Sequence, residues 1–185
     1  MSKLTVYEMV SLDGFIADAA GDMSWAHKND SEWNEFANEN ARGKGTLLFG
    51  RTTYEMMESF WPTDMAAKQM PVVAARMNSS SKIVFSRTIE TPTWQNTRVV
   101  KGDLGAEVTK LKAEASADMT IMGSANVVAQ LIEAGVVDQI TLAVHPLVLG
   151  GGKSIFAGVT TRPRFRQTKT RTFKDGSIVL YFDRA

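Results

Sequence analysis

Short apolar runs alternate with longer stretches of helical periodicity along the 185-residue chain. Apolar runs bounded by turn residues are typical of buried strands, and apolar positions three and four apart are typical of one face of a helix. We predict strands at residues 4–10, 46–49, 82–85, 98–100, 119–122 and 139–145. We predict helices from about residue 31 to 41, 51 to 60, 64 to 70, 104 to 115 and 125 to 134.

Capping and turn residues set the ends of these elements. Asp30 or Ser31 is suited to cap the first helix, Pro71 is expected to stop the short third one, and Gly135 is expected to end the last. Residues 164–173 and 177–182 form a predicted hairpin, because Lys174-Asp175-Gly176 is a strong turn signal. Strands that alternate with helices and end in a hairpin predict an α/β sandwich with a mixed sheet.

The composition excludes several kinds of function. Hydrophobic content is 44% and charged content 22%, which is ordinary for one globular domain spanning residues 1–185. The net charge is +1, so no basic field favours nucleic acid or membranes, and without cysteine or helically spaced histidines no metal site is expected. The start of the chain leads directly into a strand without an apolar signal region, which predicts a cytoplasmic protein.

Candidate chemistry gathers where predicted strands end. Gly50-Arg51-Thr52-Thr53 follows an apolar run and opens a helix, and Gly123-Ser124 does the same later in the chain. Helix N-termini offer unpaired amides to phosphate, and Ser86-Arg87 after a third strand would suit a ribose 2′-phosphate. The three ends together suggest a phosphorylated dinucleotide. The alternative is that each turn only caps its own helix or strand.

The sequence also resembles a known family. Three blocks, residues 11–17 (SLDGFIA), 49–55 (FGRTTYE) and 121–125 (IMGSA), resemble the dihydrofolate-reductase-like superfamily. Residues 131–138 and 146–152 are similar to its branch that contains the C-terminal reductase domain of bifunctional riboflavin biosynthesis proteins (RibD). The resemblance covers nearly the whole chain.

The resemblance implies a dihydrofolate-reductase-like three-layer sandwich and NADPH as hydride donor. It implies a cis peptide between Gly123 and Ser124. It further implies a homodimer, for which the strand 178–182 is the expected edge. Carried over by position, the cofactor-binding residues are Ile16, Ala17, Gly50, Arg51, Thr52, Thr53, Ser86, Arg87, Gly123, Ser124, Ala125 and Asn126.

The substrate end departs from both known patterns. Asn34 stands near the place where folate reductases carry a carboxylate, and Phe15 replaces the basic residue of the riboflavin branch. Asp13 is the candidate catalytic carboxylate, either orienting substrate or relaying a proton; the alternative is an Asp-Gly turn in which it bonds its own backbone. Trp25, in a loop from Asp18 to Lys28, is a candidate pocket wall with Phe36 and Phe60.

We therefore expect an NADPH-dependent reductase that transfers hydride to a C=N or C=O group of a small, heterocyclic, pterin- or pyrimidine-like substrate. One alternative is the riboflavin-pathway 5-amino-6-(5-phosphoribosylamino)uracil reductase. The other is a non-catalytic nucleotide-binding module, which would hold NADPH without oxidising it.

Overall fold

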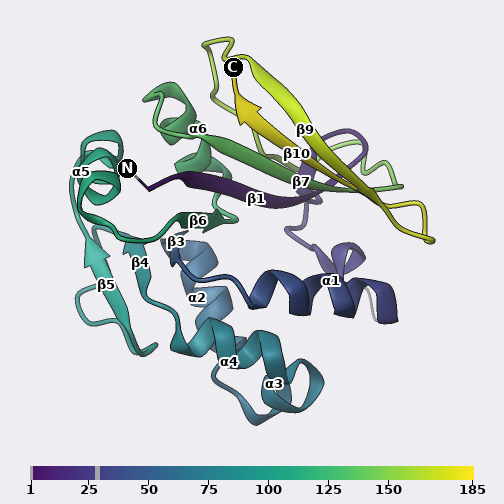
Figure 1. Cartoon of the computed structure of the whole chain (residues 1–185), viewed down its shortest axis with the longest axis horizontal. Helices are drawn as coiled ribbons and strands as arrows, with labels where there is room; N and C mark the ends of the chain where they lie inside the picture. The colour runs from purple at the N-terminus through teal and green to yellow at the C-terminus, as the bar shows by residue number, and fades with distance from the viewer. Residues whose placement is uncertain (1, 28–29) are drawn as a thin grey trace.

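The computed structural model describes residues 2–27 and 30–185, so Lys28 at the end of the predicted loop lies outside the described residues. One sheet of eight strands, in the order β5-β4-β3-β6-β1-β7-β10-β9, runs through the molecule between layers of helices (Figure 1). Its strands are β1 (Leu4–Ser11), β3 (Thr46–Gly50), β4 (Lys82–Phe85), β5 (Thr97–Val100), β6 (Met119–Met122), β7 (Gln139–His145), β9 (Phe165–Thr172) and β10 (Ile178–Arg184). A separate antiparallel pair joins β2 (Phe15–Ala17) to β8 (Lys153–Ser154).

The helices agree with the sequence pattern except at one place. They are α1 (Ser31–Ala41), α2 (Arg51–Phe60), α3 (Asp64–Gln69), α4 (Pro71–Ser79), α5 (Leu104–Glu114) and α6 (Ala125–Glu133), with a 3-10 turn η1 (Ser24–Ala26). Asp30 caps α1 by accepting a hydrogen bond from the Trp33 amide at 2.9 Å. Pro71 ends α3 as predicted but also opens α4, which the sequence did not predict, because proline fits the first position of a helix.

Alternating residues of the strands supply two separate cores. Leu48 on β3 and Val6 on β1 face α5 and α6, where they pack with Val108 and Leu131. The neighbouring Leu47 and Phe49 face α2 and α4 instead. Farther along that second face, α1 packs Trp33 and Phe36 against Phe173 and the strands β7 and β10. The sheet is therefore buried on both sides, as the mostly apolar strands require.

Parallel pairing places the ends of the central strands at one edge of the sheet. The pairs β1–β6, β1–β7, β3–β6, β3–β4 and β4–β5 are all parallel. Within this sheet β10 and β9 run antiparallel, as the C-terminal hairpin predicted from the sequence. The fold is therefore the expected mixed α/β sandwich with a mostly parallel sheet.

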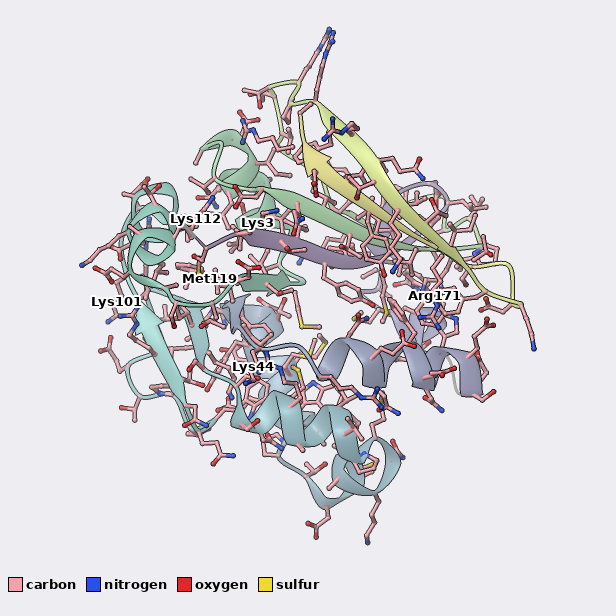
Figure 2. All side chains as sticks on the ribbon, viewed as in Figure 1. Lys3, Lys44, Lys101, Lys112, Met119 and Arg171 are labelled. Atoms are coloured by element: carbon pink, nitrogen blue, oxygen red, sulfur yellow. The ribbon has the colours of Figure 1, made fainter. Side chains whose placement is uncertain are left out.

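The hairpin corrects one expectation. The strand 178–182 was predicted to be an open edge for a dimer, but β10 lies inside the sheet, paired with β7 on one side and β9 on the other. The edge strand on this side of the sheet is β9, whose exposed residues include Arg166 and Lys169. Charged edge strands disfavour pairing with another sheet. Figure 2 shows Arg171 of β9 beside α1, where its guanidinium pairs with Glu39 at 2.6 Å.

A buried lysine joins the second core to the end of α4. Lys82, the first residue of β4, is 1% exposed. Its ammonium donates hydrogen bonds to the carbonyls of Met77, Asn78 and Ser80 at 2.8 to 3.2 Å and lies 4.5 Å from the centre of the Trp94 ring. These carbonyls end α4 without a following turn of helix, so Lys82 caps them.

No helix of the described residues is long and apolar enough to cross a membrane.

Candidate active site

The three strand ends singled out in the sequence lie side by side. In the parallel register Gly50 is opposite Phe85, so Ser86 and Arg87 follow directly beside the first turn of α2. On the other side of β3, Leu48 is opposite Ile121, which brings Gly123 level with Gly50. Neighbouring strands are about 4.8 Å apart, so the row from β4 through β3 and β6 to β1 spans about 14 Å. The three strand ends therefore lie in one row along this edge of the sheet.

Ser124 joins the two helix-opening turns. Its hydroxyl accepts a hydrogen bond from the Gly50 amide at 2.8 Å and donates one to the Thr53 hydroxyl at 2.8 Å. A β-carbon on Gly50 would lie 2.7 Å from the Ser124 hydroxyl, and one on Gly123 would lie 2.7 Å from Thr53, so both positions require glycine. The first turns of α2 and α6 are therefore in direct contact.

The turn before α6 differs from the expected geometry. No peptide bond of the described residues is cis, so the predicted cis bond between Gly123 and Ser124 is wrong. Instead both residues adopt left-handed backbone conformations, with φ of 64° and 67°. Such a conformation is costly for serine, and its two buried hydrogen bonds hold Ser124 there.

The other predicted phosphate-binding residues differ in their exposure and in their hydrogen-bond partners. Arg51 and Thr52 are exposed, and Arg51 forms an exposed pair with Glu55 at 3.2 Å. The Ser86 hydroxyl accepts hydrogen bonds from two amides of its own turn, whereas Arg87 is exposed and forms no hydrogen bond or ion pair with another described residue. On α6, Ala125 is buried and Asn126 is exposed.

Asp13 lies in the loop after β1 and holds a second loop against it. Its carboxylate accepts hydrogen bonds from the Ser11 hydroxyl at 2.6 Å and from the amides of Leu149 and Gly150 at 3.2 and 2.8 Å. These bonds, the Ser11 hydroxyl foremost, lower the pKa of Asp13, so the group is an anion at neutral pH. The hydrogen bonds of the Asp13 carboxylate therefore come from a side chain two residues away and from a loop that lies far along the chain.

The strand β2 is held close to that same loop. Ile16 and Ala17 are buried, and Gly152 crosses so closely that a β-carbon on it would lie 2.1 Å from the Ala17 carbonyl oxygen. The loop of residues 149–152 therefore covers β2, the strand that the resemblance places against the nicotinamide.

The predicted pocket residues are not brought together. Phe36 is 2% exposed and packs in the core against the stacked rings of Trp33 and Phe173. Phe60 is partly exposed at the C-terminal end of α2, with its ring against Trp61. Trp25 is partly exposed, with its ring edge toward His145, which is fully buried at the end of β7. Of the three, Phe36 has the environment of a core residue.

Two of the hollows among the described residues differ in where they lie relative to the sheet. A hollow of about 280 Å³ lies between the first turn of α5 and the side of α6, bordered by Asp103, Asn126 and Gln130. Another, of about 430 Å³, is bordered by Thr46, Lys82 and Thr97, which begin their strands. Since ligands of open α/β sheets bind beyond the carboxyl ends of the strands, the latter is not the candidate active site.

Sequence reasoning missed one residue of this region, Glu8. It is 5% exposed in the middle of β1, and its Oε1 atom has no hydrogen-bond partner among the described residues. Burial raises the pKa of Glu8 to about 8, partly offset by the Gly123 amide and the positive charge of Lys153. The signal was a single carboxylate on the face of β1 that otherwise carries Leu4, Val6 and Val10, since a buried charge among apolar side chains is costly.

Comparison with known proteins gives the family. The family model of the RibD C-terminal domain matches residues 2–179. The chain belongs to the RibD C-terminal domain family. The uncharacterized protein YyaP of Bacillus subtilis (strain 168) is 29% identical over 174 residues, covering 94% of this chain and 90% of that protein.

Solved structures agree with the fold of this RibD C-terminal domain. A candidate riboflavin biosynthesis protein from Shewanella sp. PV-4 superimposes with a TM-score of 0.75 at 24% identity, covering 99% of each chain. The dihydrofolate reductase of Enterococcus faecalis, crystallised with NADP(H), superimposes with a TM-score of 0.64 at 15% identity, covering 98% of this chain and 96% of that one. The dihydrofolate-reductase-like fold expected from the sequence is confirmed.

Proposed function

We propose that this protein is an NADPH-dependent reductase that reduces a C=N or C=O group of a small heterocyclic molecule of the pterin or pyrimidine type. The observation that carries the proposal is the contact between the first turns of α2 and α6 through Ser124, beside the exposed Arg87. NADPH, when bound, supplies the hydride. The residues of the chain bind and orient the two reactants and exclude water between them.

The residues present fit the cofactor at its phosphates. Neither α2 nor α6 has a side-chain cap, so their first amides remain available to an anion. Arg51, whose exposed pair with Glu55 is weak, is placed to add a charge at the diphosphate. Arg87 would hold the adenosine 2′-phosphate, a bidentate pairing that suits a guanidinium.

The riboflavin-pathway reductase is the second candidate, because the family supports a reductase of that type. Its substrate is a phosphorylated ribosylamino-pyrimidine, and the resemblance places a substrate-binding cation where this chain has Phe15. Phe15 lies on β2 opposite Ser154 and carries no charge. We therefore favour an unphosphorylated heterocycle over the riboflavin intermediate.

Titration of the purified protein with NADPH and with NADH tests the cofactor assignment. We expect NADPH to bind at least about tenfold more tightly, because one guanidinium–phosphate pair is worth about 1.4 kcal/mol or more. Arg87→Ala should remove this preference, and Arg51→Ala should weaken both nucleotides. Arg98→Ala, an exposed arginine on β5, is the matched control and should change neither affinity.

Two results would contradict the proposal. If neither nucleotide binds, the cofactor assignment is wrong. If NADPH binds but no acceptor oxidises it in a broad screen of pterins, pyrimidines and simple imines, the protein is the non-catalytic nucleotide-binding module instead.

A further inference from the structure

Glu8 occupies the point where two central strands part. The β1–β6 ladder ends at the pair Tyr7 and Met122, and the next residue of β1 is Glu8. From there β1 continues beside β7 alone, from Glu8 opposite Leu142 to Ser11 opposite His145. Glu8 is therefore level with Gly123, the turn that the proposed function assigns to the cofactor.

The surroundings of Glu8 leave one oxygen of its carboxyl group, Oε1, without a hydrogen-bond partner among the described residues. Its side chain lies on the same face of β1 as Val6 and Val10, in the core beneath α6. The Gly123 amide serves the carboxyl group, but an apolar residue would fill this position at less cost than a buried carboxyl whose second oxygen lacks a partner, so stability does not account for glutamate here.

The charged and titratable groups around Glu8 leave it protonated at neutral pH. Lys153 on β8 favours its ionised form, and Tyr7 on β1 interacts with its charge. The Gly123 amide faces the carboxyl group from the end of β6, and the titratable residue of α6, Glu133, lies at the far end of that helix. Because desolvation outweighs the attraction of Lys153, the pKa of Glu8 is raised to about 8.

We propose that Glu8 is the catalytic acid of this reductase, the group that gives its proton to the nitrogen or oxygen of the substrate as the adjacent carbon is reduced. The inference rests on the proposed function. The C=N or C=O double bond takes a hydride on carbon from the dihydronicotinamide and a proton on the heteroatom from Glu8. The products are the reduced substrate, the oxidised nicotinamide and the Glu8 carboxylate, which regains a proton from water.

The two other carboxyl positions of the site do not serve as the acid. Asp13 is an anion that already accepts three hydrogen bonds. The position on α1 where folate reductases carry their carboxylate is held by Asn34, which is exposed. Glu8 is the one acid among these that holds a proton at neutral pH.

Proton release on nucleotide binding tests this role without turnover. NADP⁺ brings a positively charged ring to the site and NADPH a neutral one, so NADP⁺ should displace the Glu8 proton and NADPH should not. Calorimetry near neutral pH, in buffers that differ in protonation enthalpy, counts the protons released. We expect NADP⁺ to release close to one proton more than NADPH does, and we expect this difference to vanish in Glu8→Gln; the small release from the 2′-phosphate, whose second pKa is about 6, is common to both nucleotides.

Glu8→Gln keeps the shape of the protonated side chain. The matched control is Glu114→Gln, at an exposed position on α5, which should release as many protons as wild type. Infrared spectra of the wild-type protein follow the same event independently, as the loss of a protonated-carboxyl band when NADP⁺ binds. In turnover, Glu8→Gln should lower kcat by about a hundredfold or more, the usual contribution of a general acid, with the NADPH affinity within about threefold of wild type.

The outcomes separate the two proposals. Binding of both nucleotides with no Glu8-dependent proton release, or an unchanged kcat in Glu8→Gln, overturns the role of Glu8 and leaves the reductase standing. Failure of both nucleotides to bind overturns the proposed function, and the role of Glu8 with it.

Discussion

Replacing Glu8 with glutamine should change how the stability of the protein depends on pH. The folded-state pKa of Glu8 is about 8, against an ordinary value of 4.5 for a solvated glutamate, so the folded protein holds a proton that the unfolded chain has lost at neutral pH. The stability contributed by this proton is complete below the unfolded pKa and is lost as pH rises through the folded one. Each unit of pKa difference is worth about 1.4 kcal/mol, so the full loss is on the order of 5 kcal/mol.

Urea unfolding of wild type and Glu8→Gln, at about pH 5 and about pH 9, measures this loss directly. Glutamine does not ionise, so the variant lacks this loss. From about pH 5 to about pH 9 the free energy of unfolding of wild type should fall by several kcal/mol more than that of Glu8→Gln. Glu114→Gln, at an exposed position, should follow wild type throughout. A difference between wild type and Glu8→Gln that stays constant with pH would refute the burial argument.

Three further substitutions test other parts of the account. Asp13→Asn should speed hydrogen exchange at the Leu149 and Gly150 amides and lower turnover while sparing NADPH affinity; an unchanged rate with every substrate would exclude a role for Asp13 in turnover. Lys82→Met leaves three carbonyls uncapped and should cost about 2 to 4 kcal/mol of unfolding free energy in urea, and a cost near zero would contradict its capping role. Ser124→Ala should be less stable than Ser124→Gly by about 1 kcal/mol, since only glycine relieves the left-handed backbone; the reverse order would argue against strain at this turn.

The sequence predicted the sheet well because its strands are short apolar runs with clear ends. The strands β4, β6 and β7 begin and end at the predicted residues. The helix α4 was missed because Pro71 both ends one helix and begins the next, and the sequence alone does not reveal that a second helix follows. The edge role expected of the strand 178–182 was wrong because an apolar strand is as well suited to the interior of a sheet, and the polar β9 covers it.

The candidate site was predictable where it depends on the backbone and less so where it depends on burial. Glycine followed by polar residues located the turns at Gly50 and Gly123, because parallel strands bring such turns to one edge. The bond from Ser124 to Gly50 joins residues 74 positions apart, which no local pattern reveals. Sequence reasoning missed the burial of Glu8, and it placed Phe36 at a pocket although this side chain is 2% exposed, because burial depends on what packs above a side chain.

The most direct test of the central claim is whether this protein transfers hydride from NADPH to a heterocyclic acceptor. Purified protein is mixed with NADPH deuterated at the transferable position and, separately, with pterin, unphosphorylated pyrimidine and phosphoribosylamino-pyrimidine acceptors, and the products are examined by mass spectrometry. We expect one deuterium on carbon in a reduced unphosphorylated product, formed in step with NADPH oxidation. NADPH that binds yet stays reduced with every acceptor would contradict it.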